Sequence, residues 1–514
     1  MLLSALTLAT FLVHGYHPLA EDGGLYVAGV EFTLNRSLFP HFTRFVTEHL
    51  RFSIFAPLLA AIIRVTHLSL GIVLLLAYLG SIALTLLAAC AILRRVVSSE
   101  RAQLTGVALF AALWTLPVAA TSLMLMDPYV TARSFSTPLS LFAIAFALDP
   151  WPFAEGAPHS SHAWRSFIAC LATLALAILF HPLMAGYALG LILVIRLLRW
   201  PHRLITIPAL LLLTLILAAV LQAIAPAEDP NVVVASFSRY YWFLSQWHWY
   251  ELLGLAGPLL IFAIFLRYKS HLREAGAALC RASLILGPLS VTVALLFAHE
   301  SYRTHLVARL QPLRCFLPLY AIMVLLLGAA LWQLAAHLTA RFPSRYLKSL
   351  ATALPALLIF ATALAMFAVQ RSEFPSSHHL ELPWRAPANP WSQAFAWSRT
   401  HTSPNALFAL DAHYITLPGE DSQTFRATSE RSVLPDFSKD GGEAAITPAL
   451  ADTWAAGVAA QLNLNEEPDA QRFAALTPYR VDWIVLLSNS TTSLRCPYDN
   501  GTVKVCRLAS TAGR

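Results

Sequence analysis

The residues best suited to chemistry are two adjacent acids near the N-terminus, Glu21 and Asp22. They come shortly after the first apolar segment and His17, and Gly23 and Gly24 follow them directly. Asp and Glu total only 28 of 514 residues, so a paired carboxylate stands out in this chain. Carboxylates at such a place act as a general base or bind a divalent cation. We therefore predict that Asp22 and Glu21 are catalytic.

Further polar residues lie where apolar segments end. Charged groups at membrane depth are costly and usually functional, the guanidinium fork suits phosphate, and aromatic rings stack on sugars or anchor at the interface. The predicted substrate-binding residues, spread over the loops that we place on the same side as Asp22, are His17, Asp127, Arg133, His181, Trp242, His248, His299, Glu300, Arg303, Arg309, Gln311 and Arg314.

Each of these residues also has a structural interpretation. The Trp and Tyr residues at 240–250 are typical of an aromatic belt. His181 precedes a proline and suits a helix end, and Asp127 and Arg133 suit a structural ion pair. The arginines at 303–314 suit nonspecific contact with lipid headgroups. The sequence leaves these alternatives open.

The composition requires a helical membrane bundle to position such residues. The chain is 57% hydrophobic and 12% charged, and its mean hydropathy is +0.61. Repeated apolar stretches near the length of a bilayer indicate membrane helices, and the net charge of +7 is no argument for nucleic acid. We predict about eleven helices, near 1–15, 69–93, 102–122, 138–150, 165–180, 183–198, 204–225, 252–267, 281–298, 312–335 and 349–369. A shorter helix is expected at 53–64, lying in the interface or packed on the bundle.

The orientation follows from the loops. Lys and Arg are more numerous near 94–101, 165, 196–203, 267–281 and 341–348 than in the opposite loops. The richer set is expected in the cytoplasm. With eleven spans, the N-terminus then lies inside and residues 370–514 lie outside. The first segment lacks a basic start and a small-residue cleavage site, so we do not expect it to be removed.

The composition changes after Gln370. We predict a bundle over 1–370 with a large first outer loop at 16–68, a linker rich in Pro, Ser and His at 371–390, and an extracytoplasmic α/β domain at 391–514. Short apolar runs at 406–410 and 481–487 suggest buried strands, and 391–401 and 447–462 suggest helices.

The six cysteines form two groups. Four of them, Cys90, Cys170, Cys280 and Cys315, lie in or beside apolar segments and suit small core residues. Cys496 and Cys506 flank the turn signal at 499–501. In an oxidising outer compartment, two strands meeting at this turn would bring the two cysteines close enough for a disulfide.

Four local strings, at 17–23, 127–136, 181–185 and 310–314, resemble those of an uncharacterised bacterial group of membrane proteins within the GT-C superfamily of polytopic glycosyltransferases. The resemblance implies about eleven spans, an acidic first outer loop and an outer C-terminal α/β domain in the bacterial inner membrane. It implies that Asp22 or Glu21 acts as base or metal ligand, and that a sugar moves from a polyprenyl-phosphate donor to an outer-face glycan or protein acceptor. The second acidic motif of many members has no fixed counterpart here, and Asp127 is the candidate.

The same mechanism fits the residues themselves. Arg303, Arg309 and Arg314 would stabilise the leaving phosphate, and Asp22 would take the acceptor proton. Asp22 and Asp127 would be the ligands of Mg²⁺ or Mn²⁺ if a metal is used. A non-catalytic membrane scaffold remains an alternative. A transporter is a weaker one, because the polar residues are placed at span ends rather than in mid-span.

Overall fold

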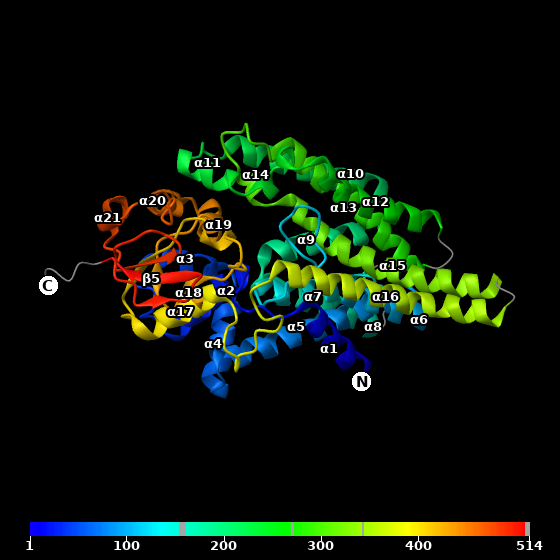
Figure 1. The fold of residues 1–514 in the computed structure, drawn as a ribbon. Coiled ribbons are helices and arrows are strands. Elements are labelled where there is room, and N and C mark those ends of the chain that lie inside the picture. The colour runs from blue at the N-terminus through cyan, green and yellow to red at the C-terminus, as the bar shows by residue number, and fades with distance from the viewer. Residues whose placement is uncertain (154–160, 269–271, 342–343, 509–514) are drawn as a thin grey trace.

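The computed structural model of the chain describes residues 1–153, 161–268, 272–341 and 344–508. Long apolar helices run side by side through most of it (Figure 1). Within the described residues, seven segments are long and apolar enough to cross a membrane: α5 (Leu70–Val96), α8 (Ser161–Phe180), α10 (Arg203–Ile224), α12 (Trp249–Arg267), α13 (Glu274–Phe297), Leu306–Arg341 and α16 (Arg345–Glu373). The chain is therefore a helical membrane protein with several spans.

Four shorter helices complete the bundle. They are α1 (Leu2–His14), α6 (Glu100–Ala112), α7 (Ala132–Ala147) and α9 (Pro182–Leu197). The segment Leu306–Arg341 consists of α14 (Leu306–Arg309), η5 (Pro312–Cys315) and α15 (Phe316–Arg341). Each of the eleven predicted segments thus contains a helix, but four of these helices are shorter than a bilayer requires.

The predicted helix at 102–122 is wrong beyond Ala112. There the chain turns back on itself, because the amide of Val118 donates to the carbonyl of Leu123 and the amide of Leu125 donates to the carbonyl of Leu116. Pro117 has no amide hydrogen with which to continue a helix. An apolar composition alone did not distinguish this folded-back segment from helix.

The first outer loop is itself helical. It contains α2 (Glu21–Leu34), α3 (Arg44–Thr47), η1 (His49–Phe52) and α4 (Phe55–Thr66). The helix predicted at 53–64 is present as α4, which is bent 96° from the segment before it. Phe55 and Leu59 of α4 are buried in the same hydrophobic core as Val27 of α2.

The C-terminal domain has a five-stranded sheet in the order β2-β1-β3-β5-β4. The pairs β1–β2 and β1–β3 are parallel, whereas β3–β5 and β4–β5 are antiparallel. Phe408 packs on one face of the sheet and Leu407 and Ala409 on the other, as strand alternation requires. The strands are β1 (Leu407–Ala409), β2 (Ser432–Val433), β3 (Trp483–Leu487), β4 (Tyr498–Asp499) and β5 (Val503–Arg507), and the helices are α17 (Pro390–His401), α18 (Phe425–Ser429), α19 (Lys439–Ile446), α20 (Ala451–Gln461) and α21 (Asp469–Leu476).

The structure contains a disulfide between Cys496 and Cys506. Cys506 lies in β5, and Cys496 lies just before its partner strand β4. The turn at 499–501 joins these two strands, as the sequence suggested.

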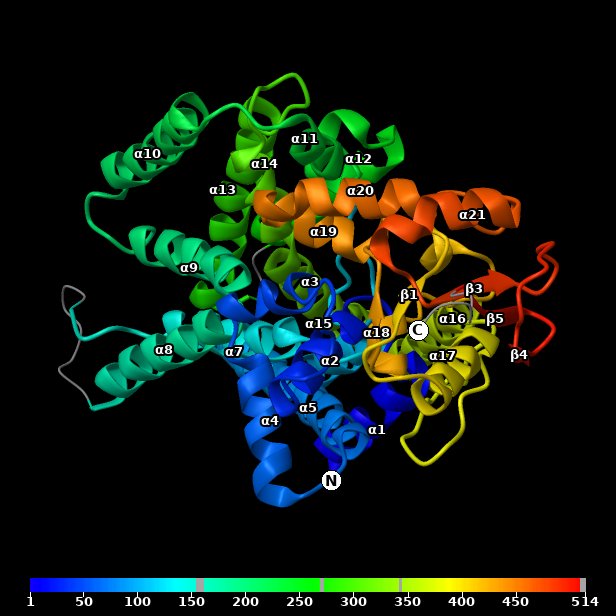
Figure 2. The same ribbon diagram turned by 90° about the vertical axis from the view of Figure 1, so that its left-hand side faces the viewer.

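The domain is docked on the bundle. The segment predicted as a linker pairs with the first loop, since the amide of Tyr16 donates to the carbonyl of His379 and the amide of Glu381 donates to the carbonyl of Tyr16, both at 2.9 Å. Figure 2 shows α19 and α20 beside α3 and α11 (Pro230–Phe237). Asn231 of α11 donates to Asp452 of α20 at 2.8 Å. The loop that follows α10 and contains α11 is therefore part of the interface between the bundle and the domain.

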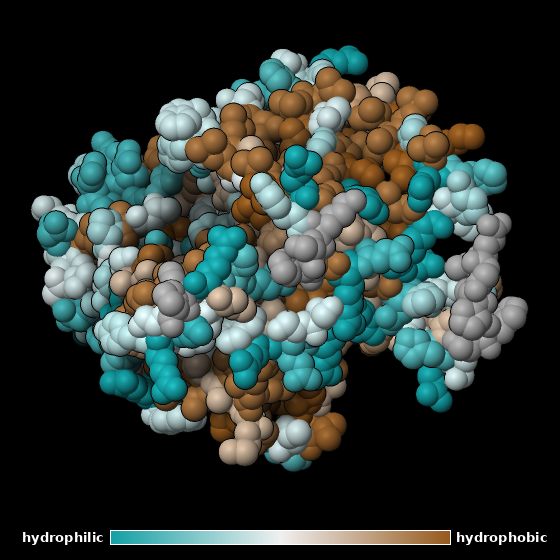
Figure 3. Space-filling view, turned by 90° about the vertical axis from the view of Figure 1, so that its right-hand side faces the viewer, coloured by the Kyte–Doolittle hydropathy of each residue, from teal (hydrophilic) through white to brown (hydrophobic). Residues whose placement is uncertain are grey.

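The two ends of the bundle differ. The C-terminal domain lies at one end, and the C-terminal end of α15 and the N-terminal end of α16 lie at the other (Figure 1). Figure 3 looks at this second end, where hydrophilic side chains gather while the flanks are hydrophobic. The basic loops at 94–101 and 196–203 lie together, because Arg95 donates to the carboxylate of Asp149 at 2.8 Å and Arg199 donates to its carbonyl at 3.3 Å. Lys269, which contributed to the charge bias, lies outside the described residues.

Candidate active site

The turn before α2 is held in an uncommon conformation. Glu21 has φ +52°, in the left-handed region that non-glycine residues rarely adopt. Its amide donates to the carbonyl of Ser422 in the C-terminal domain at 2.8 Å. A Cβ on Gly23 would come within 2.7 Å of the Pro18 carbonyl oxygen, so this position requires glycine. Backbone strain of this kind concentrates at functional sites.

Asp22 lies among cations at the N-terminus of α2. Lys439 Nζ is 3.3 Å from Asp22 Oδ1 and also contacts Glu21. Arg133 Nη1 is 4.0 Å from Asp22 Oδ2. The side chain of Asp22 is 41% exposed, so solvent reaches its carboxylate. Burial alone would raise the pKa of Asp22, but Lys439, Arg133 and Arg314 outweigh it and lower the pKa to about 2.

Arg133 connects Asp22 with a second carboxylate. Arg133 lies at the start of α7, and its Nη2 and Nε donate to Asp127 Oδ2 at 2.6 and 3.1 Å. Both side chains are buried. The structural ion pair that the sequence left open for these two residues is present, and it orients the guanidinium so that Nη1 faces Asp22.

Arg314 differs from Arg133 and Lys439 in having no carboxylate within ion-pair distance in the described part of the chain. Its guanidinium lies over the ring of Tyr241, 5.3 Å from the centroid. Its buried Nε has no hydrogen-bond partner among the described residues, although the charge acts on Asp22. A half-buried guanidinium with an unpaired Nε is suited to an anion such as phosphate.

His181 caps α9 next to this group. Its Nδ1 accepts from the amide of Met184 at 3.4 Å, so the predicted helix-end role is present. Its side chain also senses the charges of Arg133, Arg314 and Asp22. The structure thus brings together four separate segments of the chain, which carry Asp22, Glu21, Asp127, Arg133, His181 and Arg314.

Sequence reasoning missed two residues of the C-terminal domain, Lys439 and Glu443, and one of the first loop, His49. Glu443 Oε1 lies 3.6 Å from His49 Nδ1. Burial, with Asp440 and Asp22 nearby, raises the pKa of Glu443 to about 8, and burial lowers the pKa of His49 to about 4. The signal was available, because the string Lys439-Asp440-Gly441-Gly442-Glu443 repeats the acid-and-glycine pattern of residues 21–24.

His17 and Arg309 are held by structural partners. His17 Nδ1 lies 3.1 Å from Glu381 Oε2, and its ring stacks on Phe374. Arg309 donates to Glu228 at 2.8 Å, and His305 lies on the same carboxylate at 2.7 Å. Of the three arginines predicted to bind phosphate, Arg314 is the one whose charge acts on Asp22.

Trp242 corrects a sequence-based assignment. Its side chain is buried with Phe45 of α3 and Trp454 of α20, so neither ring face is free to stack on a sugar. This ring joins the bundle to the domain. The reason is the docking of α19 and α20, which a single sequence does not reveal.

The remaining predicted ligands lie in loops and at helix ends of the bundle. His248 begins α12 and stacks on Tyr250, where the exposed Trp249 suits an aromatic belt. Ser245 donates to Glu300 at 3.0 Å, and the ring of His299 contacts Ser301 at 2.9 Å. Arg303 is exposed, and the carbonyl of Gln311 accepts from Tyr187 at 2.9 Å.

The carboxylates do not form a ready metal site. Within the described residues, no three His, Cys, Asp or Glu side chains are grouped to hold a metal ion. Asp127 is directed at Arg133, and Asp22 is directed at Lys439. This donor set does not fit a divalent cation, which prefers several oxygen ligands. The role of Asp22 and Asp127 as ligands of Mg²⁺ or Mn²⁺ stays a prediction.

No protein-family model and no curated protein sequence matches this chain.

Proposed function

We propose that the chain is a membrane glycosyltransferase of the GT-C type, which moves a sugar from a polyprenyl-phosphate donor to an acceptor on the outer face. One observation carries the proposal. The solvent-accessible carboxylate of Asp22 lies among Arg133, Lys439 and Arg314 at the end of an apolar bundle. Such a site offers cations for a phosphate and a base for a hydroxyl, with lipid-exposed helices nearby.

The proposed reaction exchanges one bond for another. The acceptor oxygen attacks the anomeric carbon, the bond from that carbon to the phosphate oxygen breaks, and the configuration inverts. The proton of the acceptor hydroxyl moves to Asp22. The negative charge that develops on the leaving phosphate is stabilised by Arg314 and Arg133, which are positioned before the reaction starts.

The low pKa of Asp22 has a place in this scheme. A carboxylate of pKa about 2 is a weak base while Lys439 and Arg133 hold it. A bound phosphate competes for the same cations, because it carries negative charge of its own. Donor binding would therefore raise the pKa of Asp22 and activate it only when substrate is present.

The proposed topology has eleven spans in a bacterial inner membrane, with the N-terminus in the cytoplasm and residues 370–514 in the periplasm. The four short helices α1, α6, α7 and α9 would count as spans beside the seven long segments. Supporting this orientation, the basic loops at 94–101 and 196–203 lie together at Asp149, and the loops of this set carry more Lys and Arg than the opposite loops.

The test is sugar transfer by the purified chain in lipid nanodiscs, with a panel of polyprenyl-phosphate sugars and outer-face acceptors. We expect transfer by wild type, and a loss in Arg314→Gln, which keeps most of the side-chain volume but not the charge. Arg345→Gln, a change of the same kind at an exposed position at the start of α16, is the control and should retain activity. Transfer that is undiminished in Arg314→Gln would contradict the phosphate role, and a wild type inactive with every donor would favour the scaffold alternative.

A further inference from the structure

Helix α2 has a second functional face. Asp22, Tyr26 and Gly29 follow one another at spacings of four and three residues and face the candidate active site, where Tyr26 contacts His49 edge-on. Val27, Glu31 and Leu34 have the same spacings and line a cavity instead. Asp22 and Glu31 are nine residues apart, about two and a half helical turns, and so lie on opposite sides of α2. The cavity is therefore separate from the site of Asp22.

The cavity is large and mostly apolar. It has a volume of about 700 Å³ and lies between α2, the start of α5 and the C-terminal domain. Leu34, Leu38, Leu70 and Leu74 form much of its wall. Leu70 and Leu74 belong to the first turns of a membrane-spanning helix, so this wall lies where the span meets the membrane surface. A lipid in the membrane can reach a cavity at this depth.

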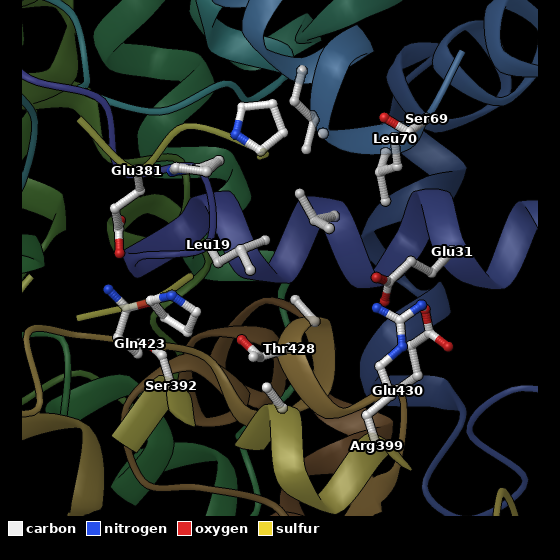
Figure 4. Close-up of a pocket in the computed structure, with 18 of the residues that line it drawn as sticks. Leu19, Glu31, Ser69, Leu70, Glu381, Ser392, Arg399, Gln423, Thr428 and Glu430 are labelled. Atoms are coloured by element: carbon white, nitrogen blue, oxygen red, sulfur yellow. The ribbon is translucent and has the colours of Figure 1, made fainter. Parts of the chain in front are cut away.

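One end of the cavity is polar (Figure 4). There Glu31 of α2 faces Glu430 and Arg399 of the C-terminal domain, and Arg399 Nη2 lies 2.5 Å from Glu430 Oε1. Glu31 is only 6% exposed, and its Oε2 has no hydrogen-bond partner among the described residues. Burial and the charge of Glu430 raise the pKa of Glu31 well above its usual value, against the opposing effect of Arg399. A buried carboxyl group with a free oxygen lacks a donor.

The charges at this end identify the missing group. While Glu31 is protonated, Arg399 balances the charge of Glu430 alone, and a further cation here would allow Glu31 to ionise as well. A primary ammonium has three donors and is small enough to reach both Glu31 and Glu430. Exposed Arg385 also lines the cavity and provides a cation for a phosphate.

We infer that this cavity binds an aminophospholipid, with its ammonium on Glu31 and Glu430, its phosphate toward Arg385 and an acyl chain along Leu70 and Leu74. The inference does not depend on the proposed sugar transfer, because it concerns the opposite face of α2. Phosphatidylethanolamine fits the chemistry, since its headgroup carries both charges and hydrogen-bond donors. Phosphatidylcholine has the same charges, but its ammonium has no hydrogen to donate.

The experiment compares headgroups on the wild-type chain. Delipidated protein in detergent is titrated with phosphatidylethanolamine, phosphatidylcholine, phosphatidylglycerol and a glucosyl diacylglycerol of identical acyl chains, and bound lipid is counted by native mass spectrometry. We expect phosphatidylethanolamine to bind about tenfold tighter than phosphatidylcholine, or more, as one hydrogen bond to a charged group would give. Equal binding of these two lipids, or tighter binding of the glycolipid, would overturn the inference.

A variant pair places the site. Glu31→Gln removes the carboxyl group at nearly constant size and should reduce phosphatidylethanolamine binding to the level of phosphatidylcholine. Glu48→Gln is the matched control, because Glu48 is also a buried carboxylate but pairs with Arg44 and Arg51 outside the cavity. A folded Glu31→Gln protein that keeps the preference would refute the site. If Glu31→Gln does not fold, the headgroup comparison on wild type still decides.

Discussion

Replacing Asp22 by Asn tests the chemistry of the candidate site most directly. The change keeps the size of the side chain and removes the charge between Lys439 and Arg133. Loss of a general base commonly lowers the rate about 10²–10⁴-fold. That corresponds to about 3–5 kcal/mol in the activation barrier.

The effect on folding should be far smaller. Asp22 is 41% exposed, so water screens its ion pairs, and such pairs contribute about 1 kcal/mol or less. Lys439 also retains Glu21 as a partner. We therefore expect Asp22→Asn to express and melt nearly like wild type while losing most of its transfer activity.

The assay is single-turnover sugar transfer in nanodiscs, with thermal unfolding of the same samples. Asp149→Asn is the matched control, because Asp149 is also ion-paired, to Arg95 at 2.8 Å, but in the loop after α7. The control should lose stability rather than rate. Transfer by Asp22→Asn at the wild-type rate would refute the assignment of Asp22 as base.

The pH profile separates Asp22 from Glu443. A base must be deprotonated to act, and the lowered pKa of Asp22 keeps it ionised in the free protein. We therefore expect kcat/KM to stay level from pH 8 down to pH 5. The acid limb of kcat should lie at a higher pH than that of kcat/KM, because the bound donor competes for the cations around Asp22 and so raises its pKa. If Glu443 were the base, kcat/KM would fall below about pH 8. A limb near pH 8 that disappears in Glu443→Gln would transfer the role to Glu443.

Three further outcomes are expected. In the folded protein the pKa of Glu443 is raised to about 8, so ionising Glu443 destabilises the fold. This destabilisation is absent below the pKa of an unfolded Glu and grows as the pH rises toward 8. The Tm of wild type should therefore fall from pH 5 to pH 8, and Glu443→Gln should flatten this fall. Non-reducing mass spectrometry should show Cys496 and Cys506 joined, and two free thiols would contradict the disulfide. Reporter fusions after Gly419 should be active only outside the cytoplasm, and activity only inside would contradict the proposed topology.

The helices were predictable because each is a continuous apolar run. The run at 102–122 failed, since Pro117 and the hairpin-like bonds of Val118 and Leu125 end the helix early. The start of α7 was also placed too late, because Ala132–Thr137 is polar yet helical, with Thr131 and Ser134 forming a capping box. An apolar run predicts a helix well, but a run of this kind does not reveal a polar stretch of helix that is buried inside the protein, such as the first turns of α7.

The site was predictable in part. Asp22, Asp127, Arg133, His181 and Arg314 were chosen because charged residues are rare in this chain, and the structure brings them together. Lys439 and Glu443 were missed because charged residues are ordinary in a soluble domain. The importance of Lys439 comes from a contact across more than 400 residues of sequence, and the local acid-and-glycine pattern does not specify its partners.

This contact also gives the C-terminal domain a role in the site. Residues 422–424 hold the turn before α2, because the amide of Glu21 donates to the carbonyl of Ser422 and the amide of Thr424 donates to the carbonyl of Leu19. Helix α19 then supplies the cation that lies closest to Asp22. Both the conformation of the acidic turn and the charge state of its carboxylate therefore depend on the domain. The domain is part of the candidate site, and a change in its docking would alter the basicity of Asp22 without changing any residue of the bundle.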